Sequence, residues 1–227
     1  MSEASGSGLQ PKSLPVRVGQ VLFSPEKLFL ALQSRPLWFW TMAATSVLAG
    51  LGIWFIPEEA WANLFREQLL ASGRVTEGAG PDVGGVGFRI ASVVGGGVSV
   101  FLMEVLIACF TFVSFVFLLG DEGHFKQHLA IVAHAGIVPA LGAIVALPLR
   151  ISQLDPQLTL SVGTLFPFVP DGYLYNVMQS LDLFALWAAV LTGLGVSLLD
   201  SRRSWASAAG ATLGLAFAFA LVAGFFR

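Results

Sequence analysis

The chain has few charged residues. Asp, Glu, Lys and Arg make up 11% of its 227 residues, whereas about a quarter is usual in soluble globular domains. The mean hydropathy is +0.78 and the formal net charge is -2. These values argue against an ordinary soluble fold. They also give no indication of a nucleic-acid partner, which would require a basic surface.

The residue patterns of common enzymes are missing as well. The single cysteine, Cys109, excludes an intrachain disulfide and is expected to be a small apolar packing residue. The segment Gly85-x-Gly87 has no third glycine and no following lysine, so it is not a nucleotide-binding fingerprint. No Ser/His/Asp triad or pair of acids suited to hydrolysis is identifiable. We therefore predict a non-enzymatic protein without a cofactor.

Long apolar runs are the main feature that is present. Five of them are each at or near the ~20 residues that a helix needs to cross the hydrocarbon core of a bilayer. We predict an all-α, polytopic membrane bundle of five transmembrane helices with short amphipathic interfacial helices. The second run, 90–119, is longer than a span needs, and Gly95–Gly97 is expected to mark its entry. The expected spans are residues 37–56, 98–119, 129–149, 181–199 and 205–226.

The segment before the first span divides into two parts. Residues 1–15 are rich in Ser, Gly and Pro and are expected to be disordered. No cleavable signal peptide is visible, so the first span is expected to remain as an anchor. In residues 16–35, Ser24 and Pro25 form a helix start that precedes an apolar face. We interpret 16–35 as a cytosolic amphipathic helix on the membrane surface; an ordinary packed helix is equally consistent. Residues 36–227 then form the five-helix domain.

Prolines and aromatic residues refine this outline. Tryptophans flank the first span, which fits the aromatic belts of a membrane: Trp38, Trp40 and Trp54. A second amphipathic segment is expected within residues 57–89. Pro139 should kink the third span and Pro148 should end it.

Small residues recur at a spacing of four in the last two runs. Such ridges let helices approach closely in lipid. The first ridge is Ala185, Ala189, Gly193 and Ser197, and the second is Ala206, Gly210, Gly214 and Ala218. Because the link between the runs is short, we predict a tight antiparallel hairpin. The alternative is that one ridge is a homodimer face.

The distribution of Lys and Arg predicts the orientation. Cytoplasmic loops carry the excess of these residues. Seven lie on the side of the N-terminus: Lys12, Arg17, Lys27, Arg35, Lys126, Arg202 and Arg203. Five lie on the other side: Arg66, Arg74, Arg89, Arg150 and Arg227. We predict a multi-pass protein of the bacterial inner (plasma) membrane, with its N-terminus in the cytoplasm and its C-terminus outside.

Three segments occur in a characteristic order: VLFSPEKLFLALQSRPLW, GHFKQHLAIVAHAGIVPALGAI and LDLFALWAAVLTGLGVSLL. Together they resemble the Yip (Ypt/Rab-interacting protein) family in its prokaryotic branch, over residues 16–226. The most specific piece is Leu181, Asp182, Phe184 and Trp187. The resemblance implies a five-helix multi-pass fold with a cytosolic N-terminus.

The same resemblance implies little about activity. Eukaryotic members of the family are linked to prenylated small GTPases and vesicle traffic, but this chain lacks their long cytosolic N-terminal region. The prokaryotic branch supplies no settled activity. Position 134 is His here, where an aromatic residue is expected.

Glu104 is the carboxylate inside the second span. A charge at mid-membrane costs roughly 2.5–3.5 kcal/mol on insertion scales, so it should face a partner or water. Two interpretations stand: an ion or proton site, or a hydrogen bond with a Ser or Thr on a neighbouring helix. Asp182 begins the fourth span, where a carboxylate is favourable at a helix N-terminus.

The loop before the third span gathers possible metal ligands: Asp121, Glu122, His124 and His128. The two histidines are four residues apart, a usable spacing for two ligands, although solvated interfacial histidines are commoner. His134 lies further along. It is expected either to cap a carbonyl freed near Pro139 or to extend a polar path from His128.

Two functions are consistent with these observations. The first is a non-enzymatic scaffold in the bilayer that binds membrane-protein partners or lipids, or forms a homo-oligomer. The second is a small transporter or channel subunit for an ion, a proton or a metal. The second function would use Glu104 and the histidines.

Overall fold

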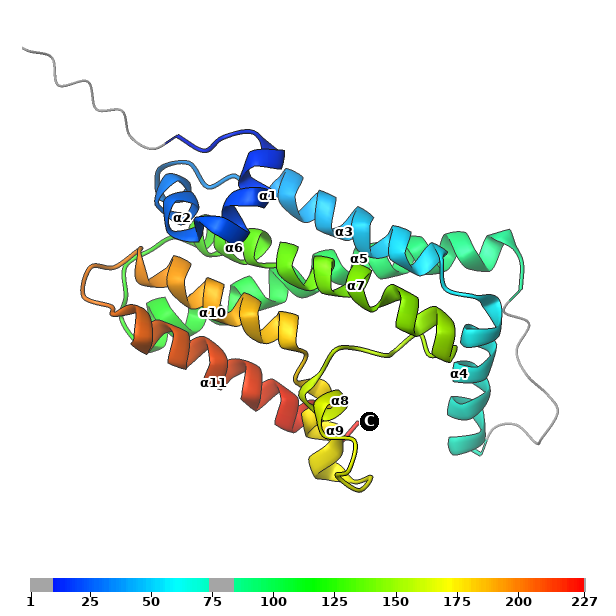
Figure 1. The fold of residues 1–227 in the computed structure, drawn as a ribbon. Helices are drawn as coiled ribbons and strands as arrows, with labels where there is room; N and C mark the ends of the chain where they lie inside the picture. The colour runs from blue at the N-terminus through cyan, green and yellow to red at the C-terminus, as the bar shows by residue number, and fades with distance from the viewer. Residues whose placement is uncertain (1–9, 74–83, 227) are drawn as a thin grey trace, which may run out of the picture.

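The computed structural model describes residues 10–73 and 84–226, and in these residues the regular secondary structure is helical (Figure 1). The predicted all-α class is therefore confirmed. The elements are α1 Leu14–Phe23, α2 Pro25–Ser34, α3 Phe39–Trp54, α4 Glu58–Ala71, α5 Val86–Phe112, the π-helix η1 Val113–Leu118, α6 Phe125–Ala135, α7 Ile137–Gln153, α8 Val162–Leu165, α9 Tyr173–Ser180, α10 Leu183–Ser197 and α11 Trp205–Ala223.

Three helical segments are long and apolar enough to cross a membrane: α5–η1, α6–α7 and α11. The other two predicted spans are shorter. α3 has 16 residues, because the chain turns at Pro57 and α4 follows at 91°. α10 has 15 residues, because Leu181 and Asp182 are extended and pair with residues 160–162 instead of continuing the helix.

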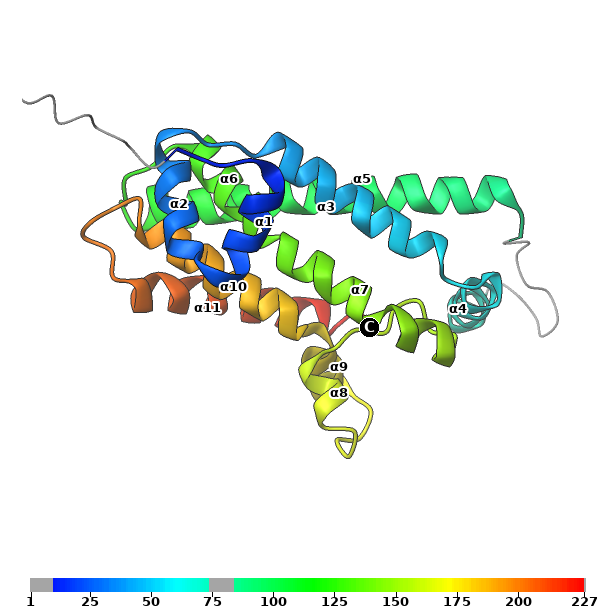
Figure 2. The same ribbon diagram turned by 45° about the horizontal axis from the view of Figure 1, so that its top comes forward.

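The α6–α7 helix is the centre of the bundle. In its most apolar stretch 67% of the residues are buried, against 22% in α5–η1 and 22% in α11. The α3–α5 pair lies on one side of it and the α10–α11 hairpin lies on the other (Figures 1 and 2). The outer helices therefore expose most of their apolar side chains. Cys109, expected to pack inside, lies on the exposed surface of α5.

Glycines set the close packing of α3 on α5. A side chain at Gly50 would place its Cβ 2.8 Å from the Val93 carbonyl oxygen, and one at Gly97 would lie 3.0 Å from the Ser46 carbonyl oxygen. Gly96 makes room for Ile53. The Gly95–Gly97 segment was predicted to mark the entry to the span. It lies in the middle of the continuous helix α5, where Gly96 and Gly97 contact α3. The point at which the span enters the membrane stays a prediction.

The break in the central helix falls at Gly136, three residues before Pro139, where a kink was predicted. α6 ends at Ala135 and α7 begins at Ile137, so Pro139 lies in the first turn of α7, where a missing N–H costs little. The prediction that Pro148 ends the helix is wrong. α7 continues through Pro148 to Gln153 and ends with Leu154 in the left-handed conformation. Neighbouring helices and small adjustments can satisfy the freed carbonyl.

The segment before the first span folds as two packed helices. The chain breaks at Ser24, and α1 begins at Leu14, within the part expected to be disordered; residues 1–9 lie outside the described residues. Leu28, Phe29 and Leu32 are at most 1% exposed. α2 packs on α6 and α10. The apolar face of α2 is therefore buried against the bundle, as the packed-helix interpretation expects. The position of residues 16–35 relative to the membrane surface stays a prediction.

Gln33 ties α2 to the end of the bundle. The side-chain amide of Gln33 donates to the backbone carbonyl oxygen of Leu198. The backbone carbonyl oxygen of Gln33 accepts a hydrogen bond from the side-chain amide of Gln127 at 2.9 Å. The N-terminal helices, the 120–124 loop and the 200–204 loop consequently gather at one end of the molecule (Figure 1).

α4 and the α8–α9 pair lie toward the other end (Figure 1). The predicted amphipathic segment of residues 57–89 includes α4. Trp61 and Phe65 of α4 make edge-on contacts with the Phe88 ring, and Glu58 forms an ion pair with Arg89 at 3.0 Å. On the opposite side of the bundle, the Tyr173 hydroxyl of α9 donates to the Leu221 carbonyl oxygen at 2.9 Å.

α10 and α11 form the predicted antiparallel hairpin. A Cβ at Gly193 would lie 2.6 Å from the Cα of Ala209, and the Thr212 hydroxyl donates to the Ala189 carbonyl oxygen at 2.8 Å. The first ridge thus contributes Ala189 and Gly193 to the contact. Ser197 is buried and Ala185 is exposed.

The second ridge faces away from α10. All four of its residues are exposed: Ala206, Gly210, Gly214 and Ala218. The contact is made by Ala208, Ala209 and Thr212. Because α11 is apolar and rich in small residues on every side, spacing alone could not select the packed face.

We expect Gly193→Ala to lower the free energy of unfolding in detergent by about 1–3 kcal/mol, because the added methyl group overpacks the contact with Ala209. Gly210→Ala is the matched control, since nothing lies within 4 Å of its added Cβ. This control should leave the stability unchanged or raise it by up to about 1 kcal/mol, the difference in helix propensity. Equal destabilisation by both variants would contradict the packing described here.

Candidate functional site

A buried guanidinium group begins the most polar region of the bundle interior. Arg17 of α1 is 4% exposed. Its Nη1 atom lies 2.8 Å from Nε2 of His134, 3.3 Å from the Thr41 hydroxyl and 3.4 Å from the Leu37 carbonyl oxygen. Burial lowers the pKa of Arg17, but an arginine side chain remains charged in proteins. α1, α3 and α6 therefore meet around one cation.

The contacts of His134 define its tautomer. Arginine only donates hydrogen bonds, so Nε2 accepts from Arg17. Nδ1 then carries the proton and donates to the Ala130 carbonyl oxygen at 2.7 Å. His134 was expected to cap a carbonyl freed near Pro139 or to extend a path from His128. The structure shows neither arrangement, because its partners are Ala130, Arg17 and Thr41.

Glu104 is held by a threonine on the neighbouring helix. The Thr45 hydroxyl donates to Oε1 of Glu104 at 2.9 Å, and the missing side chain of Gly136 provides space for the carboxyl group. Oε2 has no hydrogen-bond partner among the described residues. Of the two interpretations of Glu104, this geometry matches the structural hydrogen bond.

The two sets of contacts join along α3. Thr41 and Thr45 are one helical turn apart, and the Thr45 hydroxyl also lies 3.3 Å from the Thr41 carbonyl oxygen. We call Arg17, Thr41, Thr45, Glu104 and His134 the polar row. Each member is at most 6% exposed. The row links the end of the bundle that carries α1 to the bundle interior.

Arg17, Thr41 and Thr45 were not predicted as site residues. Threonines at a spacing of four within an apolar run could have indicated a polar face directed toward Glu104. In VRVGQVL, Arg17 lies four residues before Val21, and both are buried. That spacing places the cation on the packed face of its helix and was the available signal.

The predicted metal ligands do not converge. No group of three or more His, Cys, Asp or Glu side chains suited to a metal occurs in residues 10–73 and 84–226. Asp121 is occupied by Arg203, with oxygen-to-nitrogen distances of 2.7 and 2.5 Å. His124 is an exposed residue at the start of α6. His128 is fully buried beside Phe112 and Phe115.

Ion pairs hold the 120–124 and 200–204 loops together. Arg202 binds Asp200 at 2.6 Å and also donates to the Gly120 carbonyl oxygen at 3.2 Å. The backbone N–H of Glu122 donates to Asp200 at 3.0 Å. Hydrogen bonds from Arg202 hold the pKa of Asp200 well below its usual range, and the facing carboxylates raise the pKa values of Arg202 and Arg203.

The remaining predicted residues have structural positions. Asp182 caps α10, because its carboxylate accepts the Ala185 N–H at 2.8 Å. Phe184 fills the space left by Gly142 of α7. Trp187 is 43% exposed. Pro139 lies in the first turn of α7.

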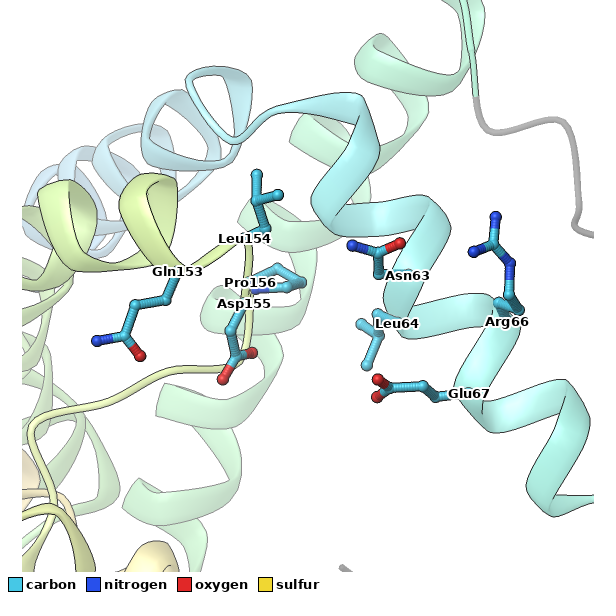
Figure 3. A pocket seen from close by; sticks show the side chains of 8 residues that line it. All are labelled: Asn63, Leu64, Arg66, Glu67, Gln153, Leu154, Asp155 and Pro156. Atoms are coloured by element: carbon cyan, nitrogen blue, oxygen red, sulfur yellow. The ribbon is translucent and has the colours of Figure 1, made fainter.

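A pocket of about 330 Å³ lies between α4 and the end of α7. Figure 3 shows Glu67 of α4 and Asp155 on facing sides of it. Its lining residues are Asn63, Leu64, Arg66, Glu67, Gln153, Leu154, Asp155 and Pro156. The predicted site residues are not among them, so this pocket is separate from the polar row.

Comparison of the chain with protein-family models, with curated proteins and with solved structures finds no match.

We expect Asp200→Asn to lower the melting temperature in detergent at neutral pH, because it removes the partner of Arg202. Since the folded-state pKa of Asp200 is depressed, its contribution is complete above the unfolded-state pKa of about 4 and is lost as the pH falls through the folded-state value. The difference between the wild type and the variant should be constant from about pH 8 to pH 5 and shrink below about pH 4.

Asp171→Asn is the control for this series, because Asp171 is exposed. It should leave the melting temperature unchanged at every pH. A difference for Asp200→Asn that grows as the pH falls would contradict the assignment of this ion pair.

Proposed function

We propose that this chain is a multi-pass membrane protein of five spans and acts as a non-enzymatic scaffold. Its N-terminus lies in the cytoplasm, its C-terminus outside, and its location is the bacterial inner membrane. The path of the chain supports this topology. α3, α5–η1, α6–α7, α10 and α11 run alternately between the two ends of the bundle (Figure 1). The 15 residues of α10 correspond to about 22 Å of helix, so the bilayer must thin locally or the helix ends must lie below its surface.

The exposed ridge on α11 is the observation that supports a scaffold most directly. Ala206, Gly210, Gly214 and Ala218 form a small-residue surface that α10 leaves uncovered. In a membrane such a surface lets the backbone of another helix approach closely. The partner is a transmembrane helix of a second copy or of another membrane protein. The resemblance to the Yip family agrees with a multi-pass protein of this kind and remains part of the proposal.

The transport alternative has less support. One carboxyl oxygen of Glu104 has no hydrogen-bond partner among the described residues, which is the feature in favour of transport. However, the histidines expected to line a path are separated. His124 is exposed, the His128 ring nitrogens have no hydrogen-bond partner in the described part of the chain, and His134 binds Arg17.

Cysteine cross-linking in native membranes tests the scaffold. In a Cys109→Ala background, Gly214→Cys places a thiol on the ridge and Phe219→Cys places one elsewhere on the exposed surface of α11. We expect a cross-linker that carries a maleimide for this thiol and a benzophenone that photoinserts into C–H bonds to link most molecules of the Gly214→Cys variant to a second helix and few molecules of the Phe219→Cys variant.

The size of the product identifies the partner. An adduct of twice the chain mass shows a second copy, and another discrete mass shows a partner protein. Equal yields at the two positions, or none at either, would contradict a docking surface on this ridge. Release of the protein from membranes by alkaline carbonate would contradict the membrane placement itself.

A further inference from the structure

A second pocket, of about 230 Å³, lies where the polar row reaches the surface near the start of α3. One cationic residue and five apolar or aromatic residues line it: Arg17, Pro36, Leu37, Trp38, Phe39 and Trp40. Trp40 is 71% exposed and Phe39 is 49% exposed. The pocket therefore combines a buried cation with a projecting aromatic rim.

The guanidinium of Arg17 is only partly satisfied by the bundle. The hydrogen bonds that it makes to the described residues all involve Nη1. Nε is buried and has no hydrogen-bond partner in the described residues, and no hydrogen bond among these residues uses Nη2. A buried donor without an acceptor is destabilising. The Nε–Nη2 edge is also one that can donate two parallel hydrogen bonds to a phosphate group.

The charge of Arg17 is likewise not balanced. The ion pairs among the described residues involve Arg89, Arg202 and Arg203, and the partners of Arg17 are a neutral histidine, a hydroxyl and a carbonyl. Buried charges are normally paired. An anion in the pocket would supply both the missing charge and the missing acceptors.

We propose that this pocket binds the phosphate of an anionic phospholipid, with the Nε–Nη2 edge of Arg17 as the donor. The aromatic and apolar lining then contacts the glycerol and the first acyl carbons. The mostly apolar lining favours a lipid over a free anion, and tryptophans such as Trp38 and Trp40 are typical of the headgroup level. Since Nε is covered, neighbouring side chains must shift when the phosphate binds. The inference rests on the membrane placement given under the proposed function.

Native mass spectrometry of the purified full chain in detergent tests this inference. The wild type is titrated with short-chain phosphatidylglycerol or phosphatidylcholine, and bound lipids are counted. We expect one phosphatidylglycerol bound roughly tenfold more tightly than phosphatidylcholine, a difference of about 1.4 kcal/mol. Both lipids offer phosphate oxygens, but the choline cation offsets the negative charge that the buried guanidinium lacks. Arg17→Gln should abolish that preference. Arg35→Gln removes an exposed arginine at the end of α2 and should leave it unchanged.

Arg17→Gln also removes the contact with His134 and could therefore weaken lipid binding by destabilising the fold. A second variant tests lipid binding without changing a buried contact. Trp40→Ala removes an exposed side chain from the rim and should weaken phosphatidylglycerol binding several-fold at an unchanged melting temperature. Excess inorganic phosphate should not displace the lipid.

Several outcomes would overturn the proposal. These are equal binding of the two lipids by the wild type, equal losses in the Arg17 and Arg35 variants, and an unaffected Trp40 variant. Displacement by inorganic phosphate would show a free-anion site and overturn the lipid assignment. In each case, continued resistance to carbonate extraction would leave the membrane placement intact, so the two proposals fail separately.

Discussion

The burial of one arginine constrains the arrangement of the N-terminal half of this protein. A guanidinium that is 4% exposed must find hydrogen-bond acceptors, because an unsatisfied buried charge is costly. Arg17 finds them on α3 and α6, through Thr41 and His134. α1 can therefore not lie freely on the membrane surface, and α2, which follows after Ser24, is brought against α6 and α10.

The other buried polar side chains of the polar row also need hydrogen-bond partners inside the bundle. Where apolar helices pack together, threonine hydroxyls are among the few groups that can satisfy an inward-facing polar side chain. Thr45 does so for Glu104, and Gly136 leaves the space that the carboxyl group occupies. The outer surfaces of α5 and α11 carry almost no polar groups. These two features together describe a bundle that is tied internally by a few polar contacts and is free to present its outer faces to lipid or to other helices.

Some of this organisation could be predicted from the sequence. Local patterns were sufficient for the helical class, for the amphipathic α4, for the capping position of Asp182 and for the α10–α11 hairpin. They were insufficient wherever a residue depends on a distant one. Asp121 and Glu122 were grouped with nearby histidines, but Asp121 pairs with Arg203, which lies far along the chain after α10. The spacing of the α11 ridge left open whether it meets α10 or forms a homodimer face. It does not meet α10, and the spacing could not decide this because every face of that helix has small residues.

The N-terminal helices show the same limit. The apolar face of Leu28, Phe29 and Leu32 is equally suited to a membrane surface and to a protein core, so the amphipathic pattern could not distinguish them. Arg17 could have indicated that this segment packs on the protein, because a cation on the apolar face of α1 requires a protein partner. That partner is His134, which lies 117 residues further along the chain. Its identity is therefore visible only in the folded protein.

A double-mutant cycle between Arg17 and His134 tests the central claim most directly. The free energy of unfolding in mixed micelles would be measured for the wild type, Arg17→Met, His134→Leu and the double variant. The contact described here predicts a coupling energy of about 1.5–3 kcal/mol, the range for a hydrogen bond to a charged group. A coupling energy near zero would mean that α1 is not held by this contact and would contradict the account.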